Sequence, residues 1–424
     1  MEDNLEREIT EEKTQNSRDT KRVYLNGFLT GTLFAMCICL VIMLSVSKFQ
    51  KVKLTGAKTS NTNSQETVMT KSVENKVKLL ENSIKEYYLE DVSNDDLEIG
   101  IYKGIVDALD DPYSAYYTDE EMQKLKESTE GIYYGIGAYV GYDQDTDHCK
   151  LTGIIPDTPA EKAGLKAEDV LVKIDGEDVA GYTTTDVVSL IKGEENTDVV
   201  LTIFRQGETD YLDITVTRQK VEAPTVTYEM LDDGIAYIQI SQFEEVTYGQ
   251  FKESMEQAKE EGMKALLLDL RSNPGGMLTS VVDIAQEILP EGLIVYTEDK
   301  YGERQEYSGD GSHKIDVPMV VLINENSASA SEILAGAIKD YGVGTLVGTT
   351  TFGKGIVQKV FGITDGTAVK LTTSHYYTPK GNDIHKVGVA PDEEVKLDVE
   401  KYLDDGSDNQ KDRGIEILKE KLKE

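Results

Sequence analysis

The chain has 424 residues, which at about 150 residues per domain predicts three units, and its hydrophobic content of 39% can fill more than one core. The 44 Lys and Arg residues stand against 78 Asp and Glu residues, so the net charge of −34 argues against nucleic-acid binding. Three cysteines and four histidines are too few for a disulfide framework or a His-rich metal site. We therefore expect no metal and no cofactor, and chemistry that rests on Ser, Lys, Asp, Glu or backbone groups.

The N-terminal part predicts a membrane anchor. After a polar tail of residues 1–22, residues 23–47 carry no charged side chain, and at about 1.5 Å per residue such a helix spans a hydrocarbon core about 30 Å thick. A cleaved signal peptide is the alternative, but the run is longer than its apolar region and no small-residue cleavage site follows. Basic residues flank the run on both sides, so the charge pattern leaves its orientation open. The Ser-, Thr- and Asn-rich residues 48–67 predict a linker.

Residues 68–126 predict a helical arm. Apolar residues recur there at helical spacing between Val73 and Tyr88, and Ser93 is a candidate N-cap for a second helix. We expect that helix to end at Asp110-Asp111-Pro112, because the residue before a proline is disfavoured in a helix.

Residues 127–222 predict a small β-sandwich module, with short strands between Gly and Asp turns and helical interruptions near Pro159–Leu165 and Thr184–Lys192. This pattern resembles a PDZ domain, in which a loop before the second strand binds the C-terminal carboxylate of a peptide that adds to the sheet edge. That resemblance implies a peptide-binding loop at four consecutive residues, Tyr134, Gly135, Ile136 and Gly137. The alternative is that the two glycines only mark a turn.

Residues 223–400 alternate strands and helices, which predicts an α/β core, and residues 401–424 predict a C-terminal helical segment. The apolar runs Ala265–Leu270 and Met319–Ile323 are typical of strands buried on both faces. In such sheets the chemistry lies in loops at the carboxyl ends of the strands, here residues 271–276 and 324–332.

The second of these loops contains the candidate nucleophile. Ser329 lies where a strand is predicted to turn into a helix, beside unpaired N–H groups of the first helical turn. The alternative is that Ser327, Ser329 and Ser331 serve as N-caps. No histidine is well placed to act as the base, which leaves a desolvated lysine as the alternative.

Lys354 is the candidate base, because apolar residues and two glycines flank it in Thr351–Gln358. Residues 348–354 also fit the GxxxxGK pattern of a phosphate-binding loop. However, Gly355 stands where that motif needs Ser or Thr, and strands rather than a helix are expected to follow. We therefore reject the NTPase interpretation.

Several tracts in one order resemble the C-terminal processing peptidases, the tail-specific serine proteases of family S41 that join a PDZ domain to a Ser/Lys core. The resemblance covers roughly Val68 to Leu422 and is carried by Leu109–Tyr116, the PDZ tracts, Asp269–Gly276, Ser327–Glu332, Thr351–Gln358, Tyr377–His385 and Pro391-Asp392. It implies Ser329 as nucleophile, Lys354 as base and Gln358 as the residue that orients the lysine. The implied oxyanion donors are the N–H groups of Ala330 and of Gly275 or Gly276.

The fold class expected is therefore a multidomain α+β and α/β chain, with a transmembrane helix, a helical arm, a PDZ-like module and a peptidase core. The resemblance implies protein substrates with free C-termini, a catalytic part outside the cytoplasmic membrane, and protomers joined into dimers through the amphipathic ends. Either end could equally pack onto its own core. A catalytically inert, membrane-tethered PDZ scaffold is the alternative function.

Overall fold

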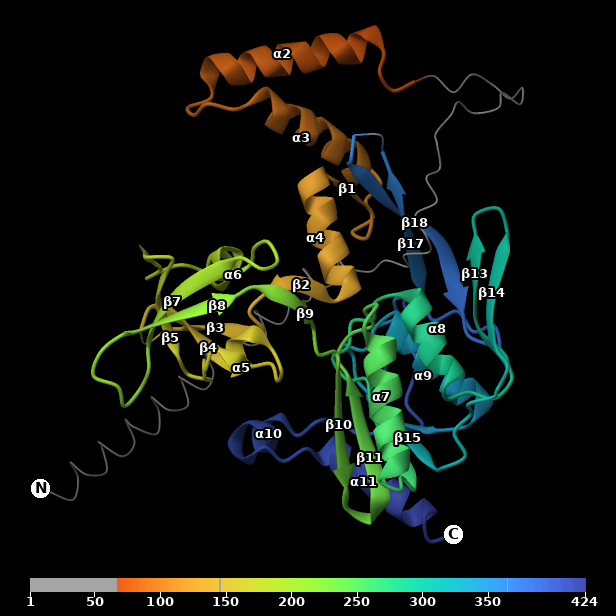
Figure 1. Ribbon diagram of the computed structural model, residues 1–424. Coiled ribbons are helices and arrows are strands. Elements are labelled where there is room, and N and C mark those ends of the chain that lie inside the picture. The colour runs from red at the N-terminus through yellow and green to blue at the C-terminus, as the bar shows by residue number, and fades with distance from the viewer. Residues whose placement is uncertain (1–66, 145, 364) are drawn as a thin grey trace, which may run out of the picture. The chain divides into compact units, whose positions relative to one another are not determined.

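The structure is a computed structural model that describes residues 67–424 except residues 145 and 364 (Figure 1). Contacts divide it into two compact units, one comprising the described residues up to Asp119 with Ile356–Ser374, the other Glu120–Gly355 with His375–Glu424. The predicted tail and anchor, and all of the linker but residue 67, lie outside the described residues. Within residues 67–424, gaps aside, no helix combines the length and apolar character needed to cross a membrane.

The first unit starts with two capped helices, α2 (Lys71–Tyr87) and α3 (Asn94–Asp107). The Thr70 hydroxyl accepts a hydrogen bond from the Val73 N–H (3.4 Å), and the predicted cap Ser93 accepts one from the Asp96 N–H (3.0 Å). Helix α3 ends before Asp110-Asp111-Pro112, as the proline rule predicts.

The rest of the first unit is a hairpin that the sequence placed in the peptidase core. Strands β17 (Ile356–Gly362) and β18 (Ala368–Tyr377) pair with each other, and β18 pairs antiparallel with β1 (Ala115–Tyr117), with Ala115 opposite Lys370. Contacts group Ile356–Ser374 with the arm, although these residues lie within the span predicted for the core, and the predicted bounds of 223–400 stay a prediction. Strand pairing between residues so distant in sequence leaves no local pattern from which this grouping could be predicted.

In the second unit, helix α4 (Asp119–Glu130) leads into the PDZ-like module. Its main sheet has the order β3-β4-β5-β7-β8 with β6 on β5, and a separate ribbon joins β2 and β9. The elements are β2 (Ile132–Gly135), β3 (Ala138–Asp143), β4 (His148–Ile154), α5 (Pro159–Lys162), β5 (Val170–Ile174), β6 (Glu177–Asp178), α6 (Thr184–Ile191), β7 (Asp198–Phe204), β8 (Leu212–Thr217) and β9 (Gln219–Glu222). Cys149 is buried in its core, where an unpaired thiol acts as a small hydrophobic residue.

The predicted peptidase part is built on a six-stranded sheet of order β10-β11-β12-β15-β16-β19. All neighbours are parallel except β10 and β11, as the α/β alternation predicts. The strands are β10 (Val226–Leu231), β11 (Ile235–Ile240), β12 (Ala265–Asp269), β15 (Met319–Ile323), β16 (Thr345–Gly348) and β19 (Glu393–Glu394), with a hairpin of β13 (Gly292–Asp299) and β14 (Arg304–Gly309). A 3₁₀ turn, Asp232–Gly234, joins β10 to β11.

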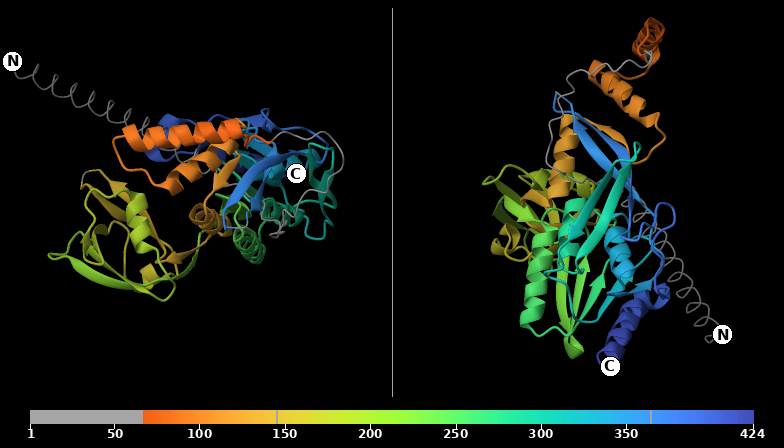
Figure 2. Two further views of the ribbon diagram at one scale, coloured as in Figure 1. Left: turned by 90° about the horizontal axis from the view of Figure 1, so that it is seen from above. Right: turned by 90° about the vertical axis from the view of Figure 1, so that its right-hand side faces the viewer.

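Helices cover both faces of this sheet (Figures 1 and 2). On one face lie α7 (Thr247–Glu260), α8 (Leu278–Gln286) and α9 (Ala330–Tyr341); on the other lies α11 (Asn409–Lys421), which follows α10 (Val399–Asp405). Ile417 and Leu418 of α11 pack against alternate residues of the strands, such as Leu267 and Leu322. Of the two alternatives for the C-terminal end, the chain therefore uses packing on its own core.

Because β12, β15 and β16 are parallel, their carboxyl ends lie at one edge of the sheet. The following loops are bonded to one another there. The Ala328 N–H donates to the Asn273 carbonyl (3.0 Å), and the Phe352 N–H donates to the Ser327 carbonyl (3.0 Å). The fold thus brings together the loops that carry the predicted nucleophile, base and oxyanion donors.

Candidate active site

Two of the three alternating serines hold the site loops together. The Ser327 hydroxyl donates to the Leu270 carbonyl (2.8 Å), and the Ser331 hydroxyl donates to the Asn273 carbonyl (2.9 Å). Both side chains are fully buried. Ser329 lies between them as the N-cap residue of α9. The pattern that looked like repeated caps therefore contains two hydroxyls that join the loops and one residue, Ser329, at the start of the helix.

Ser329 occupies a strained backbone conformation directly before α9, with φ 54° and ψ −108°. A non-glycine residue in such a sparsely populated region costs on the order of 1–3 kcal/mol, and it persists only where its surroundings fix it. Strain of this kind is frequent at functional sites. It presents the serine at the turn from β15 into α9, as the sequence predicts.

A single carboxylate holds the backbone of both predicted catalytic residues. Glu332 Oε2 accepts hydrogen bonds from the N–H groups of Ser329 and Lys354, each at 2.8 Å. Its Oε1 accepts from the Gly353 N–H (2.7 Å) and from the Thr351 hydroxyl (2.6 Å). Burial raises the pKa of Glu332 above its ordinary value, and these hydrogen bonds oppose the rise. Glu332 ends the Ser327–Glu332 tract, but nothing in the sequence pattern indicates this role.

Tyr376 links the same two residues from the other side. Its hydroxyl lies 2.5 Å from the Lys354 carbonyl oxygen and 3.0 Å from the Ser329 carbonyl oxygen. The ring is buried, which raises the pKa of this phenol well above its ordinary value and keeps it a donor. Two independent bridges, Glu332 and Tyr376, thus bring the backbones of Ser329 and Lys354 together.

The Lys354 side chain is almost wholly buried, at 1% exposure, and the glycines on either side of it are required by close packing. A Cβ at Gly355 would lie 2.6 Å from the His385 nitrogen, and one at Gly353 would lie 3.0 Å from the Val387 nitrogen. These glycines therefore admit another backbone segment, residues 385–388, beside Lys354. Strand β17 follows Lys354 where a phosphate-binding loop would need a helix, which agrees with the rejection of the NTPase interpretation.

The predicted oxyanion donors differ in availability. The Gly275 N–H donates to Asn273 Oδ1 (2.8 Å) within its own loop. The N–H groups of Gly276 and Ala330 have no acceptor among the described residues. Gly276 must be glycine, because a Cβ there would lie 2.0 Å from the Phe243 carbonyl oxygen. In this conformation Gly276 and Ala330, rather than Gly275, are the available pair.

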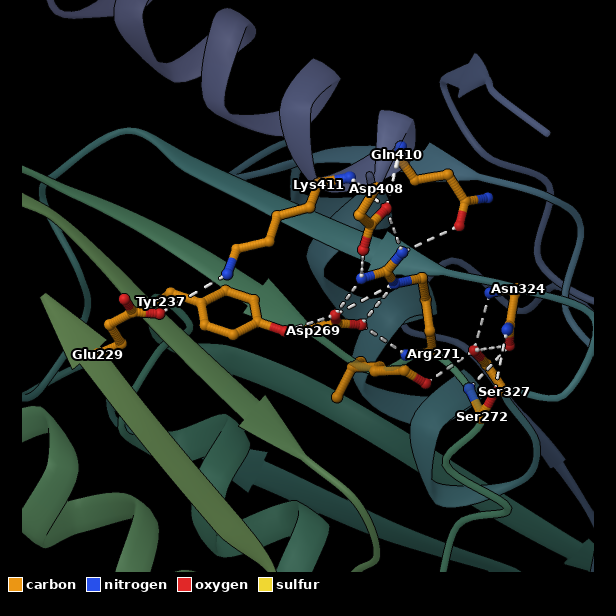
Figure 3. Close-up of polar contacts among 11 residues, drawn as sticks. Glu229, Tyr237, Asp269, Arg271, Ser272, Asn324, Ser327, Asp408, Gln410 and Lys411 are labelled. Atoms are coloured by element: carbon orange, nitrogen blue, oxygen red, sulfur yellow. Dashed lines mark hydrogen bonds and ion pairs between the residues drawn. The ribbon is translucent and has the colours of Figure 1, made fainter. Parts of the chain in front are cut away.

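An ion-pair network that was not predicted from the sequence fixes the start of residues 271–276, the loop that carries two of the predicted oxyanion donors and is called the oxyanion loop below (Figure 3). Arg271 donates to Asp269 (2.6 Å) and, across to the start of α11, to both carboxylate oxygens of Asp408 (2.9 and 2.7 Å). Burial disfavours the charge of Arg271, but the hydrogen bonds to the two aspartates outweigh it and raise the pKa of the guanidinium. Next along the loop, the Ser272 N–H donates to Asn324 Oδ1 (2.8 Å).

Gln358 lies in the other unit, on β17, and its side chain is buried. Its amide nitrogen donates to the Thr372 hydroxyl oxygen (3.2 Å). An orienting action on Lys354 therefore stays a prediction from the family resemblance.

In the PDZ-like module, the predicted peptide-binding loop is tied to the start of α5. The Ile136 carbonyl accepts from the Ala160 N–H (2.7 Å), and the Gly137 carbonyl accepts from the Thr158 hydroxyl (3.1 Å). The next strand, β3, is an edge strand of the sheet and packs against α6. An open edge beside a helix is the arrangement to which a peptide strand adds.

Two further charged residues, Asp340 and Lys192, have structural contacts. Asp340 accepts hydrogen bonds from the Lys380 N–H and the Asn382 amide, which gives it a structural role at the end of α9. Lys192 lies over the Tyr133 ring and pairs with Glu127 (3.9 Å). Across residues 67–424, gaps excepted, no group of three or more His, Cys, Asp or Glu side chains could hold a metal ion.

Comparison with known proteins finds three matching family models. Residues 234–395 match the peptidase family S41, residues 151–205 match a PDZ domain, and residues 35–122 match the N-terminal domain of the activating protease CtpB. The carboxyl-terminal-processing protease of Synechocystis is 37% identical over 292 residues, which cover 68% of each chain. The chain belongs to the C-terminal processing peptidases of family S41.

Other relatives of this S41 peptidase agree. A protein of Staphylococcus aureus (strain COL) described as a CtpA-like serine protease is 33% identical over 399 residues, which cover 93% of this chain and 77% of the relative. Among solved structures, the photosystem II D1 C-terminal processing protease is 32% identical, with 75% of this chain and 86% of that chain covered at a TM-score of 0.45. The family recognised from the sequence is confirmed: the chain is a serine-type C-terminal processing protease with a PDZ domain.

Proposed function

We propose that this S41 peptidase is a membrane-anchored endopeptidase that uses Ser329, Lys354 and Gln358 to cleave proteins whose C-termini are held by the PDZ domain. Residues 23–47 are the proposed anchor, and the catalytic part lies outside the cytoplasmic membrane. The observation that carries the catalytic assignment is the shared carboxylate of Glu332, which binds the N–H groups of both Ser329 and Lys354.

The proposed reaction follows from these positions. Neutral Lys354 takes the hydroxyl proton of Ser329, whose oxygen attacks the scissile carbonyl carbon. The tetrahedral intermediate collapses to an acyl-enzyme as the protonated lysine gives its proton to the leaving amine. Water then repeats the sequence and releases the new C-terminus. The N–H groups of Gly276 and Ala330 are the proposed donors to the oxyanion, and losing one such donor typically costs about 2.7–4 kcal/mol of transition-state stabilisation.

The test compares four variants of the full-length protein, purified in detergent, on an unfolded protein substrate. Ser329→Ala and Lys354→Ala are expected to abolish cleavage. Ser312→Ala and Lys359→Ala, which alter exposed residues of the same types, are expected to cleave at the wild-type rate. Full cleavage by Ser329→Ala would remove the assignment. An inert wild-type protein would favour the PDZ scaffold instead.

A further inference from the structure

The tract Leu109–Tyr116 carries part of the family resemblance, but none of its residues takes part in the proposed reaction. In the structure, Asp111 builds a tight turn there. Its carboxylate accepts hydrogen bonds from the Tyr113 N–H (3.0 Å) and from the Ser114 hydroxyl (2.6 Å). The Ser114 N–H donates to the Asp111 carbonyl (3.1 Å), and the Ser114 side chain is buried. Asp111 thus fixes the direction in which the Ser114 hydroxyl points its own proton.

The other side of the Ser114 hydroxyl reaches strand β18. Ser114 Oγ accepts a hydrogen bond from the Thr372 N–H (3.1 Å), a residue 258 positions further along the chain. This bond continues the pairing of β1 with β18, in which Ala115 lies opposite Lys370. The tract therefore holds the backbone of Thr372 in place.

Thr372 in turn contacts Gln358 on the neighbouring strand β17. Its hydroxyl oxygen accepts from the Gln358 amide nitrogen at 3.2 Å. Asp111, Ser114, Thr372 and Gln358 form one continuous chain of hydrogen bonds within the first unit. All the links of this chain that involve side chains are buried or partly buried.

The direction of the hydrogen bond between Gln358 and Thr372 matters, because the Gln358 amide is proposed to orient Lys354. A lysine amine held by a glutamine needs the carbonyl end of the amide, because a neutral amine that is to accept a proton must keep its lone pair free and can offer the glutamine only its N–H donors. Because the NH₂ group of Gln358 donates to Thr372, the amide oxygen of Gln358 is the group that can accept a hydrogen bond from the lysine. We propose that Thr372 and Ser114 are positioning residues that set the amide orientation of Gln358 for its action on Lys354. This inference rests on the proposed function.

The neighbouring Thr373 supplies a matched control. Its hydroxyl is also buried, but it has no hydrogen-bond partner among the described residues. Thr372→Val and Thr373→Val make the same chemical change one position apart, and only the first removes an acceptor for Gln358. Thr372→Ser keeps the hydroxyl and tests rescue.

The experiment measures kcat and KM of the full-length protein on a peptide substrate, with the labelling rate of Ser329 by a fluorophosphonate as a second readout. Thr372→Val is expected to lower kcat and the labelling rate about tenfold, the size of one lost hydrogen bond, with KM within about twofold. Ser114→Ala should lower kcat less, because it acts through the Thr372 backbone. Thr372→Ser and Thr373→Val should stay within about threefold of wild type.

A double variant separates positioning from general stability. In a Gln358→Leu background, Thr372→Val should have no further effect on kcat, because its action passes through the missing amide. Full additivity, or a wild-type rate for Thr372→Val while Gln358→Leu is slow, would overturn the inference and leave the proposed function standing. A wild-type rate for Gln358→Leu would instead remove Gln358 from the proposed catalytic set, and activity in Ser329→Ala would remove the set itself.

Discussion

Glu332 illustrates how one buried residue can organise a site without touching a substrate. Four protein donors surround its carboxylate. An ionised carboxylate can accept all four hydrogen bonds, whereas an amide cannot. Glu332→Gln would place an NH₂ group against N–H donors and weaken charge-assisted bonds worth about 1.5–3 kcal/mol each. We expect the variant to fold with reduced stability and to lose at least about a hundredfold in kcat, measured with a peptide substrate.

Glu325→Gln provides the control for this change. Glu325 lies seven positions earlier and is exposed, and within the described part of the chain its carboxylate accepts a hydrogen bond from the Thr349 hydroxyl (2.7 Å). Its conversion to glutamine should leave kcat within about twofold of wild type. A Glu332→Gln variant as active as Glu325→Gln would show that the shared carboxylate does not position Ser329 and Lys354.

Glu244 gives a pH-dependent prediction at the same scale. Burial raises the pKa of its carboxyl to about 7, and its Oε2 atom has no hydrogen-bond partner among the described residues. Between the ordinary value of 4.5 and about 7 the folded chain keeps a proton that the unfolded chain has lost. The free energy of unfolding should therefore fall as pH rises through this window, by up to about 3 kcal/mol, and remain lower above it.

Glu244→Gln should remove this pH dependence. Relative to wild type, its free energy of unfolding is expected to increase by about 1–3 kcal/mol between pH 4.5 and 8. Chemical denaturation at a series of pH values measures this difference. The neighbouring Glu245 is exposed, so Glu245→Gln should show the wild-type pH dependence. Parallel curves for Glu244→Gln and wild type would contradict the burial argument.

At this scale the sequence predicted side chains that belong to recognisable tracts, such as Ser329 and Lys354. It did not predict Glu332 or Tyr376 as their links, because nothing local shows which donors a buried carboxylate or phenol will meet. Those partners follow from the convergence of three loops after parallel strands. Likewise, Gly275 and Gly276 are equivalent in sequence, and only the turn of Asn273 distinguishes their N–H groups.

Among the elements, helix α11 shows what periodicity can and cannot predict. The apolar spacing of the C-terminal segment indicated an amphipathic helix, and the structure confirms it. The face against which it packs could not be predicted, since a partner protomer and the chain's own sheet offer the same apolar surface. Asp408, the N-cap residue of α11, also accepts a hydrogen bond from Arg271 at the start of the oxyanion loop (Figure 3). The helix is therefore coupled to the site as well as to the core.

This coupling predicts an effect of Asp408→Asn on both stability and rate. The change keeps an oxygen to cap α11 but removes the charge that Arg271 meets. We expect a loss of about 1–3 kcal/mol in the free energy of unfolding and a several-fold lower kcat, since a charged hydrogen bond is lost beside the oxyanion loop. Denaturant titration and peptide hydrolysis measure the two effects.

Asp398→Asn is the control for that variant, because Asp398 caps the neighbouring helix α10 and, among the described residues, pairs with Lys401 (3.4 Å) rather than with an arginine. It should cost less than about 1 kcal/mol and leave kcat unchanged. If Asp408→Asn lowers stability alone, with kcat at the wild-type value, then α11 supports the fold and does not position the loop.

For the whole molecule, the order of the modules could be predicted from the sequence, because apolar residues recur with a different spacing in each module. Helical spacing marks the arm, short alternating strands mark the PDZ domain, and apolar runs separated by helices mark the peptidase sheet. The grouping of Ile356–Ser374 with the arm could not be predicted, since it depends on the long-range pairing of β1 with β18.

A PDZ domain in a chain that also carries a peptidase predicts that the substrate tail, as well as the scissile bond, determines turnover.

Gly137 allows this dependence on the tail to be tested. Its φ is +84°, and a Cβ would lie 2.3 Å from Thr158 Cβ, so Gly137→Ala should displace the proposed carboxylate loop. Gly164 has a φ of +82° with open space around it, so Gly164→Ala carries the same backbone penalty without the clash. For a peptide with a free C-terminus, Gly137→Ala should raise KM about tenfold or more with little change in kcat. Gly164→Ala should resemble wild type.

An amidated version of the same peptide completes the experiment. Wild type and Gly164→Ala should prefer the free acid, whereas Gly137→Ala should treat the two peptides alike, because a loop that no longer presents its N–H groups cannot distinguish a carboxylate from an amide. Thiol labelling of the buried Cys149, followed by mass spectrometry, checks that the PDZ core stays folded in each variant. If Gly137→Ala keeps Cys149 protected and still prefers the free acid, the carboxylate is bound elsewhere. If wild type shows no preference, capture of the C-terminus is not how this peptidase selects its substrates.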